Sequence, residues 1–113
     1  MNPAAVRTIA IISYLLLPGW FIGFILNNSR PTTFGTFHVR QAFGMMCLST
    51  LLIIIVGLLN YLIAAVAGSF ILIVVGIIPV IILWMLGIIG AIRGEMKPIP
   101  YFGKTFQKWF AGL

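Results

Sequence analysis

The sequence has little charge and very few of the side chains that carry out catalysis or bind metals. Charged residues make up 7% of its 113 residues, aspartate is absent, and Glu95, His38 and Cys47 are each the only residue of their type. A typical soluble domain has about 25% charged residues. The shortage of charge excludes an ordinary water-soluble domain. With 62% hydrophobic residues, the chain is also unlike a disordered protein.

These absences also exclude several kinds of site. One histidine, one cysteine and one carboxylate cannot supply the three or four protein ligands that zinc needs, and a hydrolytic triad has no aspartate to use. Cys47 has no second cysteine to pair with, so we interpret it as a packing residue. We therefore expect no enzymatic activity, no catalytic residue, no metal and no cofactor.

Most of the sequence consists of long apolar stretches, and the mean hydropathy is +1.20. A helix that spans a membrane needs about 20 predominantly apolar residues. The uncharged stretch between Arg7 and Arg30 is long enough for one span, and that between Arg40 and Arg93 is long enough for two. Small residues at 64–69 favour a turn inside the longer stretch. We predict spans at about 8–27, 43–65 and 69–92.

The fold class that follows is all-α integral membrane, with three transmembrane helices and a C-terminal amphipathic interfacial helix. The whole chain, 1–113, is then a single membrane domain with a loop at 28–42 and an interfacial tail at 94–113. Pro18 and Pro79 lie inside predicted spans and would kink them, since proline lacks the backbone donor that a helix needs. A packing kink and a gating hinge are the two interpretations.

The basic residues predict an orientation. Three spans would put the first loop and the tail on one side with six of the seven basic residues, and Arg7 alone on the other. The positive-inside rule then places the loop and the tail in the cytoplasm and the N-terminus outside. The expected location is the plasma (inner) membrane, as a multi-pass protein.

The loop before the second span contains the most polar chemistry in the chain. If Thr36 caps a helix that begins near Phe37, then His38 and Gln41 share one helical face. One hypothesis is that His38 and Gln41 make polar contacts inside the bundle or with a partner, while Arg40 binds a lipid phosphate. The alternative is that Arg40 snorkels to the interface and His38 bonds a loop carbonyl.

The tail has the pattern of an amphipathic surface helix. Aromatic and apolar residues recur at helical spacing, with lysines on the other face. Such a helix would lie on anionic headgroups, and docking of a cytoplasmic partner is the alternative; nucleic-acid binding is not expected. The residues predicted to face lipid or a partner are Lys104, Phe106, Lys108, Trp109 and Phe110, with Phe102 and Leu113 on the same stripe.

Glycines mark predicted helix contacts. Gly19 and Gly23 form one pair of small residues four apart, and Gly87, Gly90 and Gly94 form a second row near the end of the third span. The polar residues near membrane depth are not ionised at neutral pH, which argues against an ion-coupled carrier. They are Ser13, Tyr14, Asn60 and Tyr61.

Two elements of the chain resemble a known family. They are Phe37-His38-Val39-Arg40-Gln41-Ala42 at the start of the second span, and Gly87–Gly94 followed by Pro100-Tyr101-Phe102-Gly103. This pattern is similar to a prokaryotic family of small three-span membrane proteins of unknown function, some called import component proteins, distantly related to the membrane subunit of the chloroplast inner-envelope protein translocon. The resemblance extends from Ile11 to the tail. It implies a helical membrane protein with loop and tail on one side, and it supplies no catalytic residue. The chloroplast relative has four spans, against three predicted here.

The leading hypothesis is a non-enzymatic accessory or interaction subunit of a larger membrane assembly, one that the resemblance links to protein translocation. The expected partners are anionic lipid headgroups and a larger membrane complex or further copies of the chain. A homo-oligomeric pore or transport component is the alternative. A lipid-modifying enzyme that uses His38 and Arg40 at headgroup depth is a third hypothesis, with less in its favour.

Overall fold

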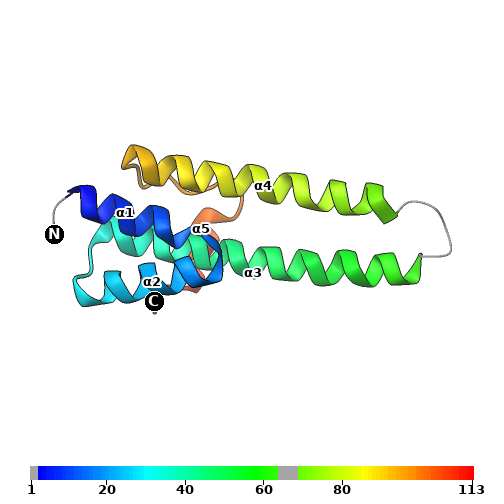
Figure 1. Ribbon diagram of the computed structural model, residues 1–113, viewed down its shortest axis with the longest axis horizontal. Coiled ribbons are helices and arrows are strands. Elements are labelled where there is room, and N and C mark those ends of the chain that lie inside the picture. The colour runs from blue at the N-terminus through cyan, green and yellow to red at the C-terminus, as the bar shows by residue number, and fades with distance from the viewer. Residues whose placement is uncertain (1–2, 64–68) are drawn as a thin grey trace.

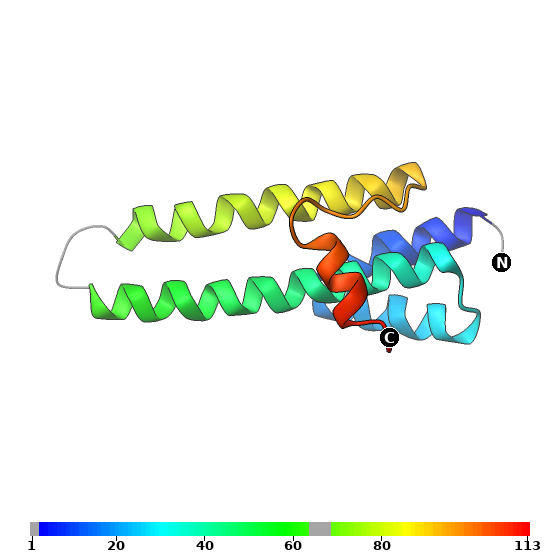
Figure 2. The same ribbon diagram turned by 180° about the vertical axis from the view of Figure 1, so that it is seen from behind.

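A computed structural model describes residues 3–63 and 69–113, and every regular element among them is a helix. The helices are α1 (Pro3–Ser13), α2 (Leu16–Ser29), α3 (Thr33–Leu62), α4 (Ser69–Arg93) and α5 (Gly103–Trp109). The molecule is elongated, with dimensions of 55 × 23 × 23 Å. Helices α3 and α4 run along its long axis, and α1, α2 and α5 cover one end only (Figures 1 and 2).

This arrangement divides the molecule into two regions. The packed half contains α1, α2 and α5 with Thr33–Met46 of α3 and Trp84–Arg93 of α4. The open half contains residues 49–62 of α3 and 72–80 of α4, where the two long helices have only each other as neighbours (Figure 1). The open half is uncharged and presents apolar side chains outward, for example Ile53 and Val75, which are 71% and 62% exposed.

Two of the described helices are long and apolar enough to cross a membrane, namely α3 and the Leu72–Arg93 part of α4. Only 17% and 6% of their most apolar windows are buried inside the chain. Helix α3 has 30 residues and is therefore about 45 Å long, against about 30 Å of bilayer hydrocarbon. Part of α3 must therefore extend beyond the hydrocarbon or tilt within it.

The first predicted span, at 8–27, is not confirmed as one helix, because the chain breaks after Ser13 and folds back. Pro18 explains the break: it has no N–H for the carbonyl of Tyr14, four residues earlier, and its ring crowds that carbonyl. The Tyr14 carbonyl instead accepts a hydrogen bond from Trp84 Nε1 on α4, at 2.7 Å. Pro18 itself lies in the first turn of α2, where a missing N–H costs nothing.

Helices α1 and α2 form an antiparallel hairpin whose close contact depends on two glycines. A Cβ on Gly23 would overlap the Ser13 hydroxyl, and one on Gly19 would lie 2.7 Å from the Ile12 carbonyl oxygen. The Gly19 and Gly23 pair predicted from sequence therefore lies inside the hairpin. It brings the two short helices together within one chain.

The hairpin changes the predicted arrangement of the termini. The Arg7 guanidinium lies beside Gly94, just beyond the end of α4, with Nη2 2.7 Å from the position of a Gly94 Cβ. Figure 1 shows the start of α1 and the end of α4 at the same end of the molecule. The predicted orientation placed Arg7 alone on one side because it counted three spans, and the first of these, at 8–27, is not confirmed.

Helix α3 begins ten residues before the predicted second span, so most of the expected loop at 28–42 is helical. Thr32 is the N-cap, and its hydroxyl oxygen accepts a hydrogen bond from the Gly35 N–H at 2.9 Å. The predicted cap, Thr36, lies inside the helix and accepts from Asn27 Nδ2 at 3.0 Å. Helix α4 coincides with the third predicted span and contains Pro79. The predicted turn at Ala64–Gly68 lies outside the described residues.

The tail forms a short helix, α5, that packs across α3. Phe106 is 5% exposed, because its ring lies over Gly44, where any Cβ would overlap it. The ring of Phe110 meets that of Phe43 edge to face, with centroids 4.8 Å apart. Phe106 therefore faces the protein, contrary to its predicted role at the lipid surface. Trp109 is 72% exposed, and Lys104 and Lys108 are also exposed.

Candidate functional site

A buried polar network joins three parts of the packed half. The Tyr14 hydroxyl lies 2.7 Å from His38 Nδ1, and Gln41 Nε2 donates to the same hydroxyl at 2.7 Å. His38 Nε2 lies 2.8 Å from the Glu95 carbonyl oxygen, and the Ile99 N–H donates to Gln41 Oε1 at 2.9 Å. The network thus connects the turn after α1, the start of α3 and the segment after α4.

The partners determine the direction of every hydrogen bond in this network. A carbonyl only accepts, so His38 Nε2 carries the proton and donates to Glu95, which leaves Nδ1 as an acceptor for the Tyr14 O–H. The Tyr14 oxygen then accepts from Gln41, whose own carbonyl accepts from Ile99. Each group has a matching partner when His38 is the neutral imidazole. A fully satisfied buried network favours one packing arrangement over others.

Glycines in and after α4 hold this network in place. Gly94 has φ +74°, a conformation that favours glycine, and it ends α4 in a Schellman motif in which the Glu95 N–H donates to the Gly90 carbonyl. The turn leaves the Glu95 carbonyl free to accept from His38. At Gly87 a Cβ would lie 2.7 Å from Cε1 of the Tyr14 ring, so the ring needs a glycine there.

The network is closed to ligands. His38 and Gln41 are 0% exposed and Tyr14 is 1% exposed. As predicted from their spacing, His38 and Gln41 lie on one face of α3, and their contacts are inside the bundle. Sequence reasoning did not assign a role to Tyr14 or Trp84; the one available signal was Pro18, which leaves the Tyr14 carbonyl without its helical donor.

Arg40 lies apart from this network, beside a polar pocket. Its Nη2 donates to the Ala111 carbonyl at 2.7 Å, and its Nε is buried without a hydrogen-bond partner. Gln107 Nε2 donates to the Phe37 carbonyl at 2.7 Å and so ties α5 to α3. The pocket has a volume of about 410 Å³ and is lined by Pro31, Thr32, Thr33, Thr36, Phe37, Arg40, Met96 and Gln107. Within residues 3–63 and 69–113, no group of three metal-ligating side chains is present.

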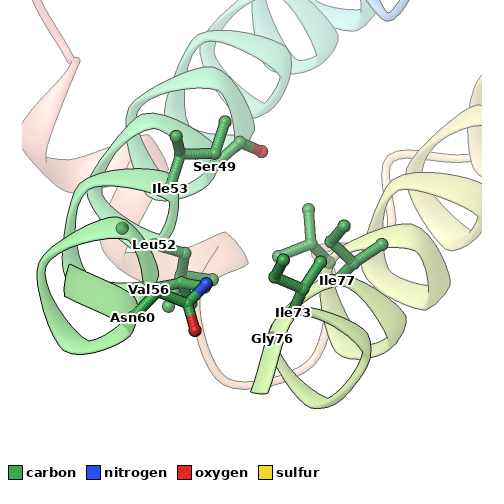
Figure 3. Close-up of a pocket in the computed structure, with 10 residues that line it drawn as sticks. Ser49, Leu52, Ile53, Val56, Asn60, Ile73, Gly76 and Ile77 are labelled. Carbon is green, nitrogen blue, oxygen red and sulfur yellow. The ribbon is translucent and has the colours of Figure 1, made fainter. Parts of the chain in front are cut away.

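A second, apolar groove lies between α3 and α4 in the open half (Figure 3). Its volume is about 340 Å³. Figure 3 shows Asn60 reaching into the space between the helices, across from Ile73 and Ile77. Asn60 Oδ1 is buried, and no group among residues 3–63 and 69–113 donates a hydrogen bond to it. The lining residues are Ser49, Leu52, Ile53, Val56, Gly57, Asn60, Ile73, Gly76, Ile77 and Val80.

A comparison with known proteins places the chain among membrane proteins. It is similar to a UPF0132 membrane protein. That protein, from Methanocaldococcus jannaschii, is 34% identical to this chain over 101 residues, which cover 88% of this chain and 66% of the relative. No family model matches the chain, and no solved structure does. The chain spans slightly less than two thirds of that relative's length. The findings support a membrane protein, all-helical over the described residues 3–63 and 69–113, with two candidate spans among them.

Proposed function

We propose that this protein is a non-enzymatic accessory subunit of a larger membrane assembly, and that its α3–α4 groove binds a transmembrane helix of a partner protein. The observation that carries the proposal is the unpaired Asn60 Oδ1 in an otherwise apolar groove. Ser49, the other polar side chain in the lining, already donates its hydroxyl proton to the Met45 carbonyl. Within the described residues, Asn60 Oδ1 is an unused hydrogen-bond acceptor enclosed between α3 and α4, and a partner's donor must enter the groove to reach it.

The membrane makes this unused acceptor significant. A buried polar group without a partner costs about 1–3 kcal/mol, and lipid tails cannot donate a hydrogen bond. A transmembrane helix with a serine, threonine, asparagine or glutamine can donate one, and such polar contacts stabilise helix association in lipid. A partner helix would therefore gain a hydrogen bond that a lipid chain in the groove could not.

Glycines in the groove also favour a helix as the occupant. Gly57 has open space around the position of a Cβ, and Gly76 faces Val56 across the groove. Small residues let helix backbones approach closely, and close packing is the main source of helix association in a membrane.

The family resemblance suggests protein translocation as the process that this subunit serves. The end of the molecule that carries Arg7, Arg30 and Arg93 would face the cytoplasm by the positive-inside rule. With the α1–α2 hairpin, the start of α1 and the end of α4 both lie at that end. A reporter fused after Leu113 should then report a cytoplasmic position, and so should one fused before α1.

The proposal is tested by purifying the tagged chain from its own membranes in mild detergent, followed by mass spectrometry. We expect stoichiometric recovery of a larger membrane complex with the natural chain and with Tyr61→Leu, a control at the neighbouring, 82% exposed position. Asn60→Leu, which keeps the branching and the number of side-chain heavy atoms but removes the amide, should lower recovery about tenfold, the effect of about 1.4 kcal/mol.

Other outcomes separate the alternatives. Recovery of only multiples of the 12.4 kDa chain would favour the homo-oligomeric alternative, since an asparagine amide can pair with its own copy in a neighbouring chain. Conductance of that oligomer in bilayers would be the next measurement. Recovery of a monomer alone would overturn the proposal.

A further inference from the structure

We propose that the pocket beside Arg40 is a binding site for a phosphate-bearing anion. The first observation is an uncompensated charge. Arg40 is half-buried, and in the part of the chain that the structure describes no carboxylate pairs with it. The only acidic side chain, that of Glu95, is exposed. A partly buried cation without a counterion is unfavourable, and a bound anion would remove that cost.

The second observation is the donor chemistry of the pocket wall. The Thr32 hydroxyl oxygen already accepts from Gly35, and that of Thr36 accepts from Asn27, so the proton of each hydroxyl is free to be donated. Thr33 adds a third hydroxyl on an exposed residue. The lining contains hydrogen-bond donors and one cation but no carboxylate. Such a wall attracts anions and repels cations.

The third observation is the kind of anion that fits. Guanidinium is planar and binds phosphate oxygens through two parallel hydrogen bonds, which makes arginine the preferred side chain for phosphate. Pro31, Phe37 and Met96 supply an apolar wall on which the carbon skeleton attached to a phosphate could lie. At about 410 Å³, the pocket is large enough to accept more than a bare inorganic ion.

The position of the pocket indicates a lipid headgroup or a soluble phosphate as the source. The pocket lies at the first turns of α3, and the uncharged apolar run of that helix begins right after Gln41. Headgroup phosphates lie at such a boundary between charged and apolar residues. This site is at the opposite end of the molecule from the α3–α4 groove. The inference does not depend on the proposed function.

The test is native mass spectrometry of the delipidated full chain in detergent, titrated separately with phosphatidylglycerol, phosphatidylcholine and inorganic phosphate. We expect phosphatidylglycerol to bind with a 1:1 stoichiometry and more tightly than phosphatidylcholine. Arg40→Gln should weaken this binding about tenfold, as for the loss of a charge-assisted contact. The control Arg93→Gln removes one positive charge from an exposed position on α4 and should change the affinity less than about twofold.

A second variant keeps the test informative if Arg40→Gln fails to fold. Thr33→Val changes an exposed position in the lining and should weaken binding about threefold while leaving the fold intact. Binding of inorganic phosphate that Arg40→Gln abolishes would support the site with a soluble phosphate as its source. Absence of binding by both phosphatidylglycerol and phosphate would overturn the proposal, as would equal losses in Arg40→Gln and Arg93→Gln.

Discussion

The packed half and the open half of this molecule use the same two long helices in different ways. In the packed half, α3 is covered by α1, α2 and α5, and its buried His38 and Gln41 have matching partners. In the open half, α3 meets only α4, and Asn60 Oδ1 has no donor. A helix that is apolar enough to span a membrane can therefore belong to the protein core along one part and present an exposed apolar surface along another.

The largest effect is expected from removing the centre of the polar network. His38→Leu leaves the Tyr14 hydroxyl proton without an acceptor and the Glu95 carbonyl without a donor, and should lower the free energy of unfolding by about 2–4 kcal/mol. Denaturant titration of the detergent-solubilised chain, followed by circular dichroism, measures this. A loss below about 0.5 kcal/mol would mean that the network does not stabilise the packed half.

Removal of one hydroxyl should have a smaller effect on the same region. Tyr14→Phe keeps the ring against Gly87 but takes away the acceptor of Gln41 and the donor to His38, so we expect a loss of about 1–3 kcal/mol. Tyr61→Phe, an 82% exposed position in the open half, is the matched control and should be neutral. Equal losses of stability in the two variants would contradict the view that the packed half depends on its polar network and the open half does not.

A pair of glycine substitutions compares the two halves directly. Gly23→Ala places a methyl group on the Ser13 hydroxyl and should destabilise the chain by about 1–2 kcal/mol. Gly57→Ala meets nothing within 4 Å and should be neutral or stabilise α3 by up to about 1 kcal/mol, because alanine is the better helix former. Thermal unfolding of both variants in one detergent gives the comparison. The predicted contrast between the two halves is wrong if both substitutions lower the free energy of unfolding by the same amount.

The smallest effect on the isolated chain is expected at Asn60. Because its Oδ1 bonds nothing within the chain, Asn60→Leu should change the free energy of unfolding by less than about 0.5 kcal/mol, or increase it slightly. The same variant should nevertheless weaken partner recovery about tenfold. A large loss of stability in the isolated, monomeric chain would show that Asn60 acts within the fold and not at an interface.

Sequence reasoning succeeded where a local pattern is sufficient. The extent of α4 follows from an uninterrupted apolar run, and the shared face of His38 and Gln41 follows from their spacing. The prediction of a single span at 8–27 was not confirmed. The composition of this segment is the same whether it forms one straight helix or folds back as a hairpin. The break at Tyr14 needs both Pro18 and the donor that Trp84 provides from 70 residues away. No local pattern contains that contact.

The tail illustrates the same limit. The aromatic stripe correctly indicated a short amphipathic helix, but a stripe does not identify what covers it. Gly44 leaves a space on α3 that the Phe106 ring fills, so the stripe turns toward the protein while Trp109 stays exposed. From sequence, binding of a lipid phosphate was one of two hypotheses for Arg40, with snorkelling as the alternative. The pocket beside Arg40 forms only where α3 meets α5 and the segment before it.

Composition and the length of the apolar runs were sufficient to predict an all-helical membrane protein, because they establish whether a chain requires water or lipid around it. The sequence also determined which end of the long helices carries charge, since charged side chains avoid hydrocarbon. Three properties come from the packing of distant segments: the hairpin in the first segment, the place of Tyr14 in the network, and the atoms of Asn60 and Arg40 that have no partner among the described residues. Those properties depend on which distant groups meet, and local sequence does not contain that information.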